Sequence, residues 1–234
     1  MSEESVQCSK CEIFACVKNE PLNAPKFCPM KTREDVLNTA LRQYSDPDDQ
    51  KMMSAAAHTV IKGITNSWTR IEDVINFARE MEYEKIGIAT CVALISESRI
   101  LTQILEIKGF EVKSICCKSG SNFEEDIGLR NDIDLKYVFE STNNSNIITN
   151  QKTSIPLCNP IAQAFLLNGE KTDLNILLGL CTGHDALFIK HSKAPVTPLI
   201  VKDRRTLHNP AAAIYGSNHF FSRLLSPERS KRRQ

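Results

Sequence analysis

Lys85-Ile-Gly-Ile-Ala-Thr-Cys91 and, after a gap, Phe110-Glu-Val-Lys-Ser-Ile-Cys-Cys117 are the two segments that decide the fold. Each is a short β-prone run with the length of a buried strand. Residues 93–108, between them, have a helical pattern that ends at Gly109. Strand, helix and strand predict a βαβ unit, in which the two strands lie parallel and are joined by a right-handed crossover.

A second unit of this kind follows. Asn159-Pro160 begins a helix that runs to Gly169, and Leu174-Asn-Ile-Leu-Leu-Gly-Leu-Cys181 is a nearly continuous apolar strand. Another helix covers residues 184–191, and Val196-Thr-Pro-Leu-Ile-Val201 is a last strand whose proline favours an edge position. We therefore predict an α/β fold with an open parallel sheet of about four strands and covering helices. Neither glycine-rich phosphate-binding pattern occurs, so nucleotide binding has no direct support.

The rest of the chain predicts additional segments. Helical patterns begin at Thr32, run from Pro47 to Gly63, and begin again at Thr69. The expected organisation is a cysteine-rich metal-binding segment, a short helical region, the α/β domain with a long inserted loop, and a basic tail, at residues 1–31, 32–83, 84–222 (loop near 118–157) and 223–234.

Composition excludes several classes of protein. Of the 234 residues 41% are hydrophobic and 24% charged, which excludes a disordered, collagen-like or coiled-coil chain. A net charge of +1 provides no general field for nucleic acid, and we interpret the basic tail as a solvated terminus. No apolar run is long enough to cross a bilayer, and the first residues lack the features of a signal peptide. We expect a cytoplasmic protein that binds neither membrane nor nucleic acid.

The nine cysteines are the main functional signal. In a reducing compartment thiols are more often metal ligands or catalytic groups than disulfides. Ligands of open α/β sheets bind beyond the carboxyl ends of the strands, where Cys91, Cys117 and Cys181 each end a predicted strand. Cys158 stands immediately before Asn159-Pro160, a helix start that favours thiolate over thiol. We therefore predict a cofactor site on Cys91, Cys117, Cys158 and Cys181.

Each of these residues also has a structural interpretation. Cysteine is a common small buried hydrophobe, and Cys116 and Cys117 cannot both face the same side of a strand. His184 and Asp185 follow the third strand end and are candidate catalytic acid-base groups, although either could serve only the helix start. Asp203 and His208 are further candidates, for which a structural role is favoured.

The N-terminal segment carries the second cysteine group. Cys8, Cys11, Cys16 and Cys28 could close a tetrahedral zinc site whose binding energy would fold the segment. The spacing is irregular for zinc and also suits an iron–sulfur cluster, so both metals, and a segment without metal, stay open.

At these residues the chain resembles an uncharacterised family of cysteine-rich microbial proteins described as metal-binding and of unknown function. The resemblance covers most of the chain and is carried by the pattern Cys8-x2-Cys11-x4-Cys16, Cys28-Pro29, Cys116-Cys117-Lys118, Cys158-Asn-Pro-Ile161, Gly179-Leu-Cys-Thr-Gly-His-Asp185, Ser192-Lys-Ala-Pro-Val-Thr197, Lys202-Asp203-Arg204 and His208-Asn-Pro210. It implies metal binding without an established reaction.

Two functional hypotheses follow. In the first, the sheet edge holds a 4Fe-4S cluster on three or four of its cysteines and acts on a small molecule in sulfur or redox chemistry, while zinc orders the N-terminus. In the second, both sites bind zinc with closed coordination and the protein is a non-catalytic scaffold or interaction module. A third reading is a cysteine nucleophile, Cys181, activated by His184 without metal. Substrate and oligomeric state do not follow from the residues.

Overall fold

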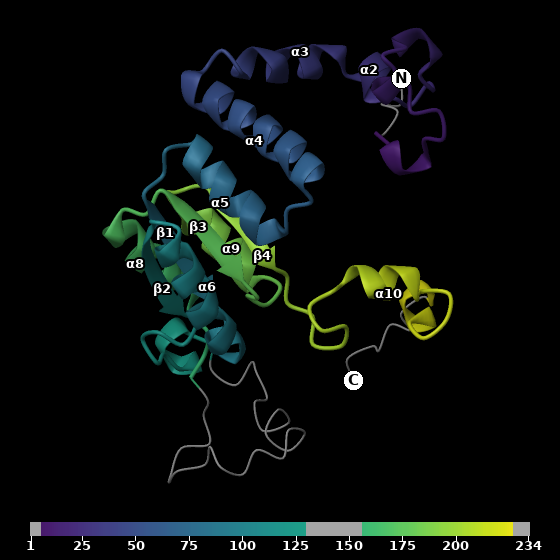
Figure 1. Ribbon diagram of the computed structural model, residues 1–234. Helices are drawn as coiled ribbons and strands as arrows, with labels where there is room; N and C mark the ends of the chain where they lie inside the picture. Colours follow the sequence, from purple (N-terminus) through teal and green to yellow (C-terminus); the bar gives the residue numbers. More distant parts are fainter. Residues whose placement is uncertain (1–5, 130–155, 227–234) are drawn as a thin grey trace. The chain divides into compact units, whose positions relative to one another are not determined.

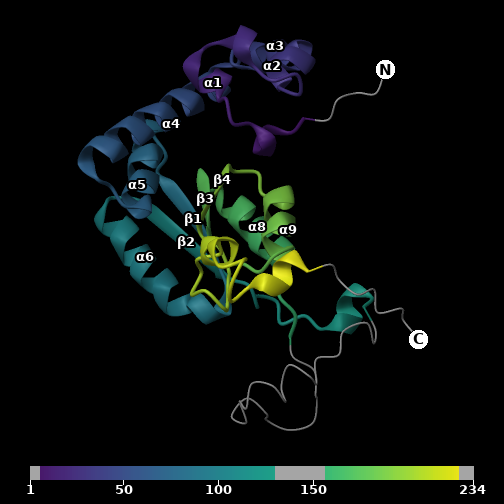
Figure 2. The same cartoon turned by 90° about the vertical axis from the view of Figure 1, so that its right-hand side faces the viewer.

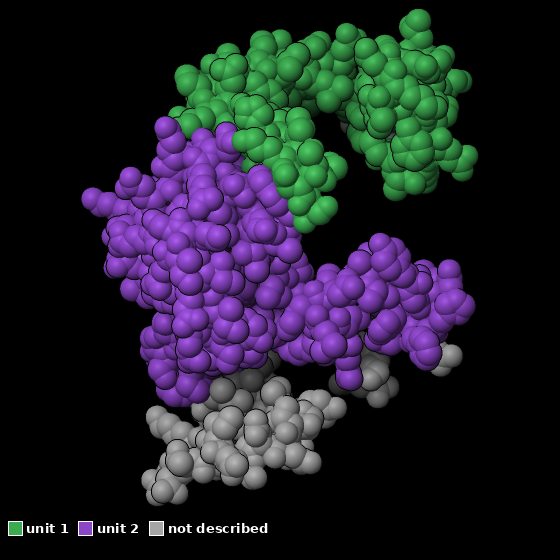
Figure 3. Space-filling model, in the orientation of Figure 1, with its two compact units in different colours: residues 1–67 green, residues 68–234 purple. Residues whose placement is uncertain are grey.

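The computed structural model describes residues 6–129 and 156–226. The chain divides into two compact units, Met1–Ser67 and Trp68–Gln234, which are coloured separately in Figure 3. The second unit contains the sheet. Within the described residues, no helix combines the length and apolar character needed to cross a bilayer.

A four-stranded parallel sheet forms the centre of the second unit (Figure 1). Its strands are β1 (Lys85–Thr90), β2 (Glu111–Cys116), β3 (Leu174–Leu178) and β4 (Val196–Ile200), in the order β2-β1-β3-β4. The predicted open parallel α/β sheet is confirmed. Pro198 lies on β4 at an edge of the sheet, beside a register shift between Leu177 and Leu178.

Helices cover both faces of this sheet (Figure 2). One face packs against α5 (Arg70–Glu80) and α6 (Ile95–Ile107), the other against α8 (Pro160–Glu170) and α9 (His184–His191). Alternate residues of each strand supply the two cores, because successive side chains point to opposite faces. Ile86 and Ile88 therefore join the first core, and Ala89 joins the second.

Helix α5 packs against the sheet and belongs to the second unit. Thr69 and Glu72 form a reciprocal capping box at its start, and Val74, Ile75 and Ala78 are buried in the first core. The unit boundary at Ser67 thus precedes this helix, whereas the sequence-based division placed residues 32–83 in one helical region. A helical period shows which face of a helix is apolar, but it does not show which element that face packs against.

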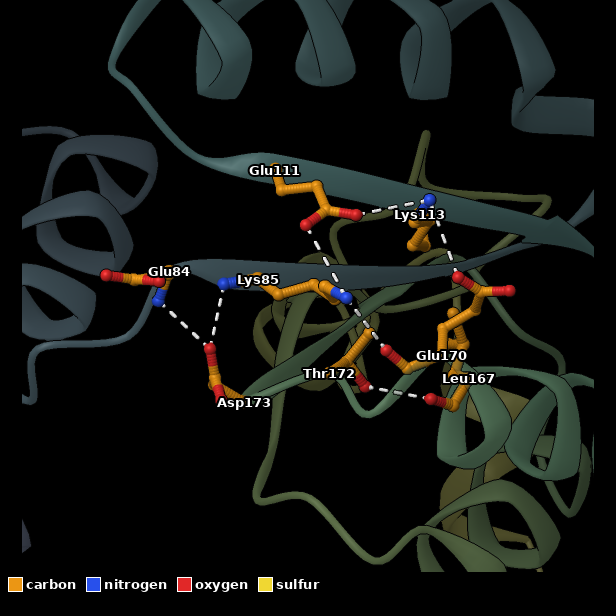
Figure 4. A network of polar contacts seen from close by, with 8 residues as sticks. All are labelled: Glu84, Lys85, Glu111, Lys113, Leu167, Glu170, Thr172 and Asp173. Carbon is orange, nitrogen blue, oxygen red and sulfur yellow. Dashed lines mark hydrogen bonds and ion pairs between the residues drawn. The ribbon is translucent and has the colours of Figure 1, made fainter.

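Polar contacts join the amino ends of the strands to the end of α8 (Figure 4). The Asp173 carboxylate accepts the backbone N–H groups of Glu84 and Lys85 at 2.9 and 2.8 Å. Around them, Lys85 and Lys113 form ion pairs of 3.2 to 3.5 Å with Glu111 and Glu170. Pairs as exposed as these contribute little stability each, because water screens them.

A buried polar side chain lies between β3 and the helices of the second face. Asn175 is 0% exposed, accepts a hydrogen bond from Thr172 Oγ1 and donates one to Ser192 Oγ, both at 2.8 Å. Its neighbour across the sheet is Gly87, where a Cβ atom would lie 2.0 Å from Asn175 Oδ1. Glycine at this position therefore leaves the space that the asparagine occupies.

The first unit contains α1 (Ala15–Lys18), α2 (Pro29–Thr32), α3 (Glu34–Gln43) and α4 (Pro47–Asn66), with short 3-10 turns at Cys8–Lys10 and Pro21–Asn23. Asp46 caps α4 by accepting the N–H groups of Asp48 and Asp49. This helix continues three residues past the predicted end at Gly63 and stops at Ser67, which adopts a left-handed conformation. A single glycine is tolerated within a helix that a later residue terminates.

The second unit also contains several short elements. A 3-10 turn at Val92–Leu94 precedes α6, another at Glu124–Ile127 follows β2, and α10 (Ala211–Tyr215) and a 3-10 turn at Ser222–Leu225 follow β4. The last two were not predicted, because elements of five and four residues are too short to show an apolar stripe. Most of the predicted inserted loop, residues 130–155, and most of the predicted basic tail, residues 227–234, lie outside the described residues.

Candidate functional site

The carboxyl edge of the sheet collects the predicted cysteines on the loops that leave its strands. Cys91 follows β1 and begins the 3-10 turn Val92–Leu94, while Cys117 follows β2 directly. Cys158 precedes Asn159, the N-cap of α8, whose side chain accepts the N–H of Ala162 at 2.9 Å. Cys91 and Cys117 are buried and Cys158 is half-buried.

Three of these thiols form a continuous contact that we call the sulfur row: Cys91, Cys117 and Cys158. Cys117 is its middle member, with 2% of its surface exposed, and its sulfur lies 3.6 Å from Cys158 Sγ. The backbone N–H of Val92, the residue after Cys91, donates to Cys117 Sγ at 3.3 Å, and the thiols of Cys91 and Cys117 interact. Residues from three distant parts of the sequence thus meet at one point.

Backbone hydrogen bonds fix the row in place. Cys117 N–H donates to the Thr90 carbonyl at 2.9 Å, and Asn159 N–H donates to the Cys117 carbonyl at 2.7 Å. Gln163 of α8 is 0% exposed and its amide donates to the carbonyls of Thr90 and Ile115 at 3.1 and 2.7 Å. Gln163 was not predicted, because only the packing of α8 shows which strand ends its side chain reaches.

The pKa values of the three thiols diverge. The pKa of Cys91 is lowered to about 5, first by its hydrogen bond with Cys117, then by the Ala93 backbone and by Lys202, whose Nζ lies 3.6 Å from its sulfur. The pKa of Cys158 is lowered to about 6 by Cys117, Lys118 and His184. The pKa of Cys117 is raised by the two flanking sulfurs and by burial. The outer sulfurs therefore favour thiolate, and the middle one keeps the proton.

Cys181 lies apart from this contact. The chain turns at Gly179, whose φ of +67° ends β3 before the predicted strand end, so Leu180 enters the second core and Cys181 lies on the loop. The Cys181 sulfur accepts a hydrogen bond from Arg204 Nη2 at 2.9 Å. Three of the four expected cofactor cysteines are thus brought together, and the fourth faces a guanidinium at the same edge.

His184 and Asp185 begin α9 and differ in their partners. The positive charge of His184 contributes to lowering the pKa of Cys158, and its Nδ1 is buried without a hydrogen-bond partner among the described residues. Asp185 Oδ1 accepts the N–H groups of Gly183 and Ala186, at 2.9 and 2.8 Å. The Asp185 carboxylate therefore orders the helix start, while His184 acts on Cys158 through its charge. Their catalytic assignment stays a prediction.

The loop after β4 is held by its own polar groups. Asp203 Oδ1 accepts the N–H groups of Arg205 and Thr206 at 2.8 and 3.1 Å, which lowers the pKa of the Asp203 carboxyl. His208 Nδ1 accepts the N–H of Asp203 at 3.2 Å. Both side chains have structural roles here, and they place Lys202 and Arg204 against the cysteines.

The N-terminal cysteines lie in the first unit. Cys8 and Cys16 are exposed, Cys11 is half-buried, and Cys28 is buried against Ala15 and Ala24. Across residues 6–129 and 156–226, no group of three or more His, Cys, Asp or Glu side chains is already placed to hold a metal ion. The zinc or iron–sulfur site on Cys8, Cys11, Cys16 and Cys28 stays a prediction.

Comparison with known proteins gives the family. Residues 28–199 match the family described as "Protein of unknown function (DUF1847)". The chain belongs to this family. The DUF1847 match covers β1 to β3 and all but the last residue of β4, and it includes Cys91, Cys117, Cys158 and Cys181, whereas Cys8, Cys11 and Cys16 precede it. The chain is also 38% identical over 220 residues to the uncharacterized protein MJ0455 of Methanocaldococcus jannaschii, covering 94% of this chain and 98% of that protein.

Within this DUF1847 fold, the sulfur row has the donor chemistry of a soft-metal site. Two thiolates on one tetrahedral ion, each about 2.3 Å from it, lie about 3.8 Å apart. The 3.6 Å between Cys117 Sγ and Cys158 Sγ is close to that spacing. A 4Fe-4S cluster places each thiolate on a different iron and needs wider spacing. The Cys117 and Cys158 sulfurs are therefore as close as two ligands of one ion, although no group of three ligands is already placed for a metal among the described residues.

Proposed function

We propose that the protein binds a soft metal on the sulfur row and acts there on a small molecule in sulfur or redox chemistry. The observation that carries this proposal is the meeting of Cys91, Cys117 and Cys158, from three separate loops, at the carboxyl edge of a parallel sheet. Ligands of such sheets bind at that edge. Thiolates are the ligands that zinc, copper(I) and iron–sulfur centres prefer.

The chain's own residues would supply three sulfur ligands and leave a fourth position to His184 or to a substrate. Metal bound in this way would polarise a substrate atom or exchange electrons with it. Lys202 and Lys118 contact Cys91 and Cys158 and favour the thiolate form that metal binding requires. Gln163 holds the ends of β1 and β2, and with them Cys91 and Cys117, in register.

The proposal includes a second metal site, zinc or an iron–sulfur cluster, on Cys8, Cys11, Cys16 and Cys28. The described core of this segment consists of Ala15, Ala24 and Cys28. So small a core supports the idea that metal binding supplies part of its folding energy. All nine cysteines are free thiols, which suits a protein of the reducing cytoplasm.

Metal-free thiol chemistry is a second candidate function. It is favoured by the absence, among the described residues, of a group of three ligands already placed for a metal, and by the closeness of Cys117 and Cys158. In this reaction the Cys158 thiolate attacks a small-molecule disulfide and releases one thiolate. Cys117, after losing its proton to solvent, attacks the mixed disulfide and releases the second. The protein is oxidised to a Cys117–Cys158 disulfide, and the small molecule is reduced.

Metal analysis separates these functions. The full chain, purified without oxygen, is assayed for zinc, copper, iron and acid-labile sulfide, together with the variants Cys158→Ala and Cys116→Ala. We expect Cys158→Ala to lose the metal of the sulfur row and the Cys116→Ala control to retain it, because Cys116 is not a member of the row. Iron with sulfide identifies a cluster, and zinc alone in colourless protein identifies a zinc site.

Equal metal content in all three proteins would refute a metal at the row. Metal-free thiol chemistry then predicts a Cys117–Cys158 disulfide after treatment with oxidised glutathione, detected by mass spectrometry of peptides. A third outcome would support the non-catalytic zinc scaffold. In it, Cys158→Ala loses zinc, and the wild-type protein reacts with no thiol, disulfide or redox reagent.

A further inference from the structure

Cations converge on the cysteines at the carboxyl edge of the sheet. Lys118 follows Cys117 after β2, and Lys202 and Arg204 lie on the loop after β4. Lys202 Nζ lies 3.6 Å from Cys91 Sγ, and Arg204 Nη2 lies 2.9 Å from Cys181 Sγ. Lys118 Nζ donates to the Pro156 carbonyl, and the charge of Lys118 lowers the pKa of Cys158. Two of the cations therefore contact a sulfur directly.

Carboxylates do not neutralise these three cations. Within residues 6–129 and 156–226, none of Lys118, Lys202 and Arg204 forms an ion pair with an acidic side chain. Asp185 and Asp203, which lie on the loops after β3 and β4, use a carboxylate oxygen to accept backbone N–H groups. In the part of the chain that the structure describes, Lys202 and Arg204 thus contact sulfur and form no ion pair with a carboxylate.

Metal binding would make the surroundings of these cations less negative. The two outer thiolates of the metal-free row carry minus two, whereas three thiolates with a divalent ion carry a net charge of minus one. A 4Fe-4S cluster in its 2+ state, bound by the same thiolates, gives the same result. The edge would then attract an anion, and the attraction is strong where protein excludes water on one side.

The two cations after β4 also have donors to spare. A guanidinium has five N–H donors and an ammonium three, and a single sulfur contact occupies few of them. The Asp203 and His208 hydrogen bonds order the loop between them, so Arg204 is presented from a fixed backbone. A guanidinium held in this way suits the planar or tetrahedral arrangement of oxygens in an oxyanion.

We propose that the carboxyl edge binds a small oxyanion through Arg204 and Lys202, so that the substrate of the sulfur row is an anionic small molecule. This inference rests on the proposed function, because the metal or thiolate centre supplies the reaction and these cations supply the recognition. Carboxylate, phosphate, sulfate and thiosulfate share the required chemistry. The order of their affinities identifies which group the natural substrate carries.

The test measures anion binding by isothermal titration calorimetry on the full chain as purified without oxygen. The probes are thiosulfate, sulfate, phosphate and malonate, at an ionic strength held constant with chloride. We expect at least one of them to bind with 1:1 stoichiometry and to slow alkylation of Cys181 by iodoacetamide. Arg204→Gln should weaken binding by about tenfold or more, since a charge-assisted hydrogen bond is lost.

Arg205→Gln is the matched control, because it removes the same charge from the next residue while Asp203 still accepts the backbone N–H of position 205. Unchanged affinity in this variant supports a site built on Arg204. The inference would be overturned if both variants lost the same affinity for the anion. It would also be overturned if no probe bound to protein that contains its metal. Either result would leave the proposed function standing. Binding that depends on Arg204 in a protein without metal at the row would refute the metal and retain the anion site.

Discussion

Cys117 makes the three thiols of the sulfur row unequal. It is the most buried of them and contacts both of the others, so it favours the proton while Cys91 and Cys158 favour the negative charge. Adjacent residues adjust this balance, since Lys118 and Lys202 attract the charge to the outer positions. Reactivity at this edge therefore depends on which sulfur is exposed to a reagent, and the half-buried Cys158 is the accessible thiolate of the row.

Alkylation of Cys158 should report this arrangement. In protein freed of metal by a chelator under argon, we expect its rate of reaction with iodoacetamide to rise with pH through a midpoint near 6, because the pKa of Cys158 is lowered to about 6. A lowered pKa means that thiolate is present above this midpoint and lost as the pH falls through it. The rate is measured from pH 5 to 9 by mass spectrometry of the Cys158 peptide.

Two variants check the cause. Cys117→Ala removes the largest contribution to the low pKa, so the midpoint should move up towards that of an ordinary thiol, about 8.5. Cys116→Ala leaves the row intact and should keep the midpoint near 6. A midpoint that is the same in both variants would mean that Cys117 does not control the thiolate.

Gly87 and Asn175 provide a second test at the residue scale. Gly87→Ala would place a Cβ atom 2.0 Å from Asn175 Oδ1, so the buried amide must move and give up hydrogen bonds to Thr172 or Ser192. We expect a loss of about 2 to 4 kcal/mol in the free energy of unfolding, from overpacking and the broken network together.

Urea unfolding followed by circular dichroism measures this loss. Gly169→Ala is the control, because nothing lies within 4 Å of its added Cβ atom and the position is within α8. It should be neutral or stabilise by up to about 1 kcal/mol. If the two variants have equal stability, the space opposite Asn175 is not the reason for glycine at position 87.

At the scale of the element, the sequence predicts strands well where burial is complete. All residues of β3 are buried, and so are all but the first of β1, so their apolar runs were recognisable. The positions predicted for Cys91 and Cys181, beyond the ends of these strands, followed from these runs. The residues at which the strands end were harder to predict. β3 stops at Leu178 because Gly179 turns the chain, so Cys181 lies on the following loop and is not a member of the sulfur row. Side chains that reach across elements, such as Gln163, Lys202 and Arg204, leave no periodic signal and could not be assigned.

Gln163 tests whether α8 supports the sulfur row. Gln163→Leu has nearly the same size but leaves the Thr90 and Ile115 carbonyls without these donors in a buried place. We expect a loss of about 2 to 4 kcal/mol in unfolding free energy and a weaker metal affinity or a shifted Cys158 midpoint. Chelator competition and the alkylation profile measure the second effect, which a role limited to stability would leave unchanged.

Asn168→Leu is a matched control on the same helix. Asn168 donates to the His191 carbonyl and accepts the Lys193 N–H, so it links α8 to the end of α9 and has no contact with the strand ends in these bonds. We expect this variant to lose stability while the alkylation midpoint of Cys158 stays near 6. A shifted midpoint in both variants would show that general loosening of α8, and not Gln163, alters the row.

At the scale of the whole molecule, the division into two units separates the two groups of cysteines. The sulfur row lies in the unit of residues 68–234, with two apolar cores of its own, while Cys8, Cys11, Cys16 and Cys28 lie in the unit of residues 1–67. The sequence indicated two groups from spacing alone. It could not show where the helical region divides, because α5 resembles α3 and α4 in pattern but packs on the sheet.

This separation predicts that the N-terminal segment can loosen alone. Cys11→Ala should remove a ligand of the proposed N-terminal metal site and expose residues 8–31 to trypsin, since the described apolar core of the segment is only Ala15, Ala24 and Cys28 with the partly buried Met30. The sheet unit should stay folded, because neither of its two apolar cores contains a residue of that segment. Chelation of the wild-type protein should reproduce the new cleavages.

Cuts that spread past Lys85, or a lowered unfolding midpoint of the sheet, would show that the two units do not fold independently. Cleavage identical to wild type in Cys11→Ala would instead show that no metal orders the segment.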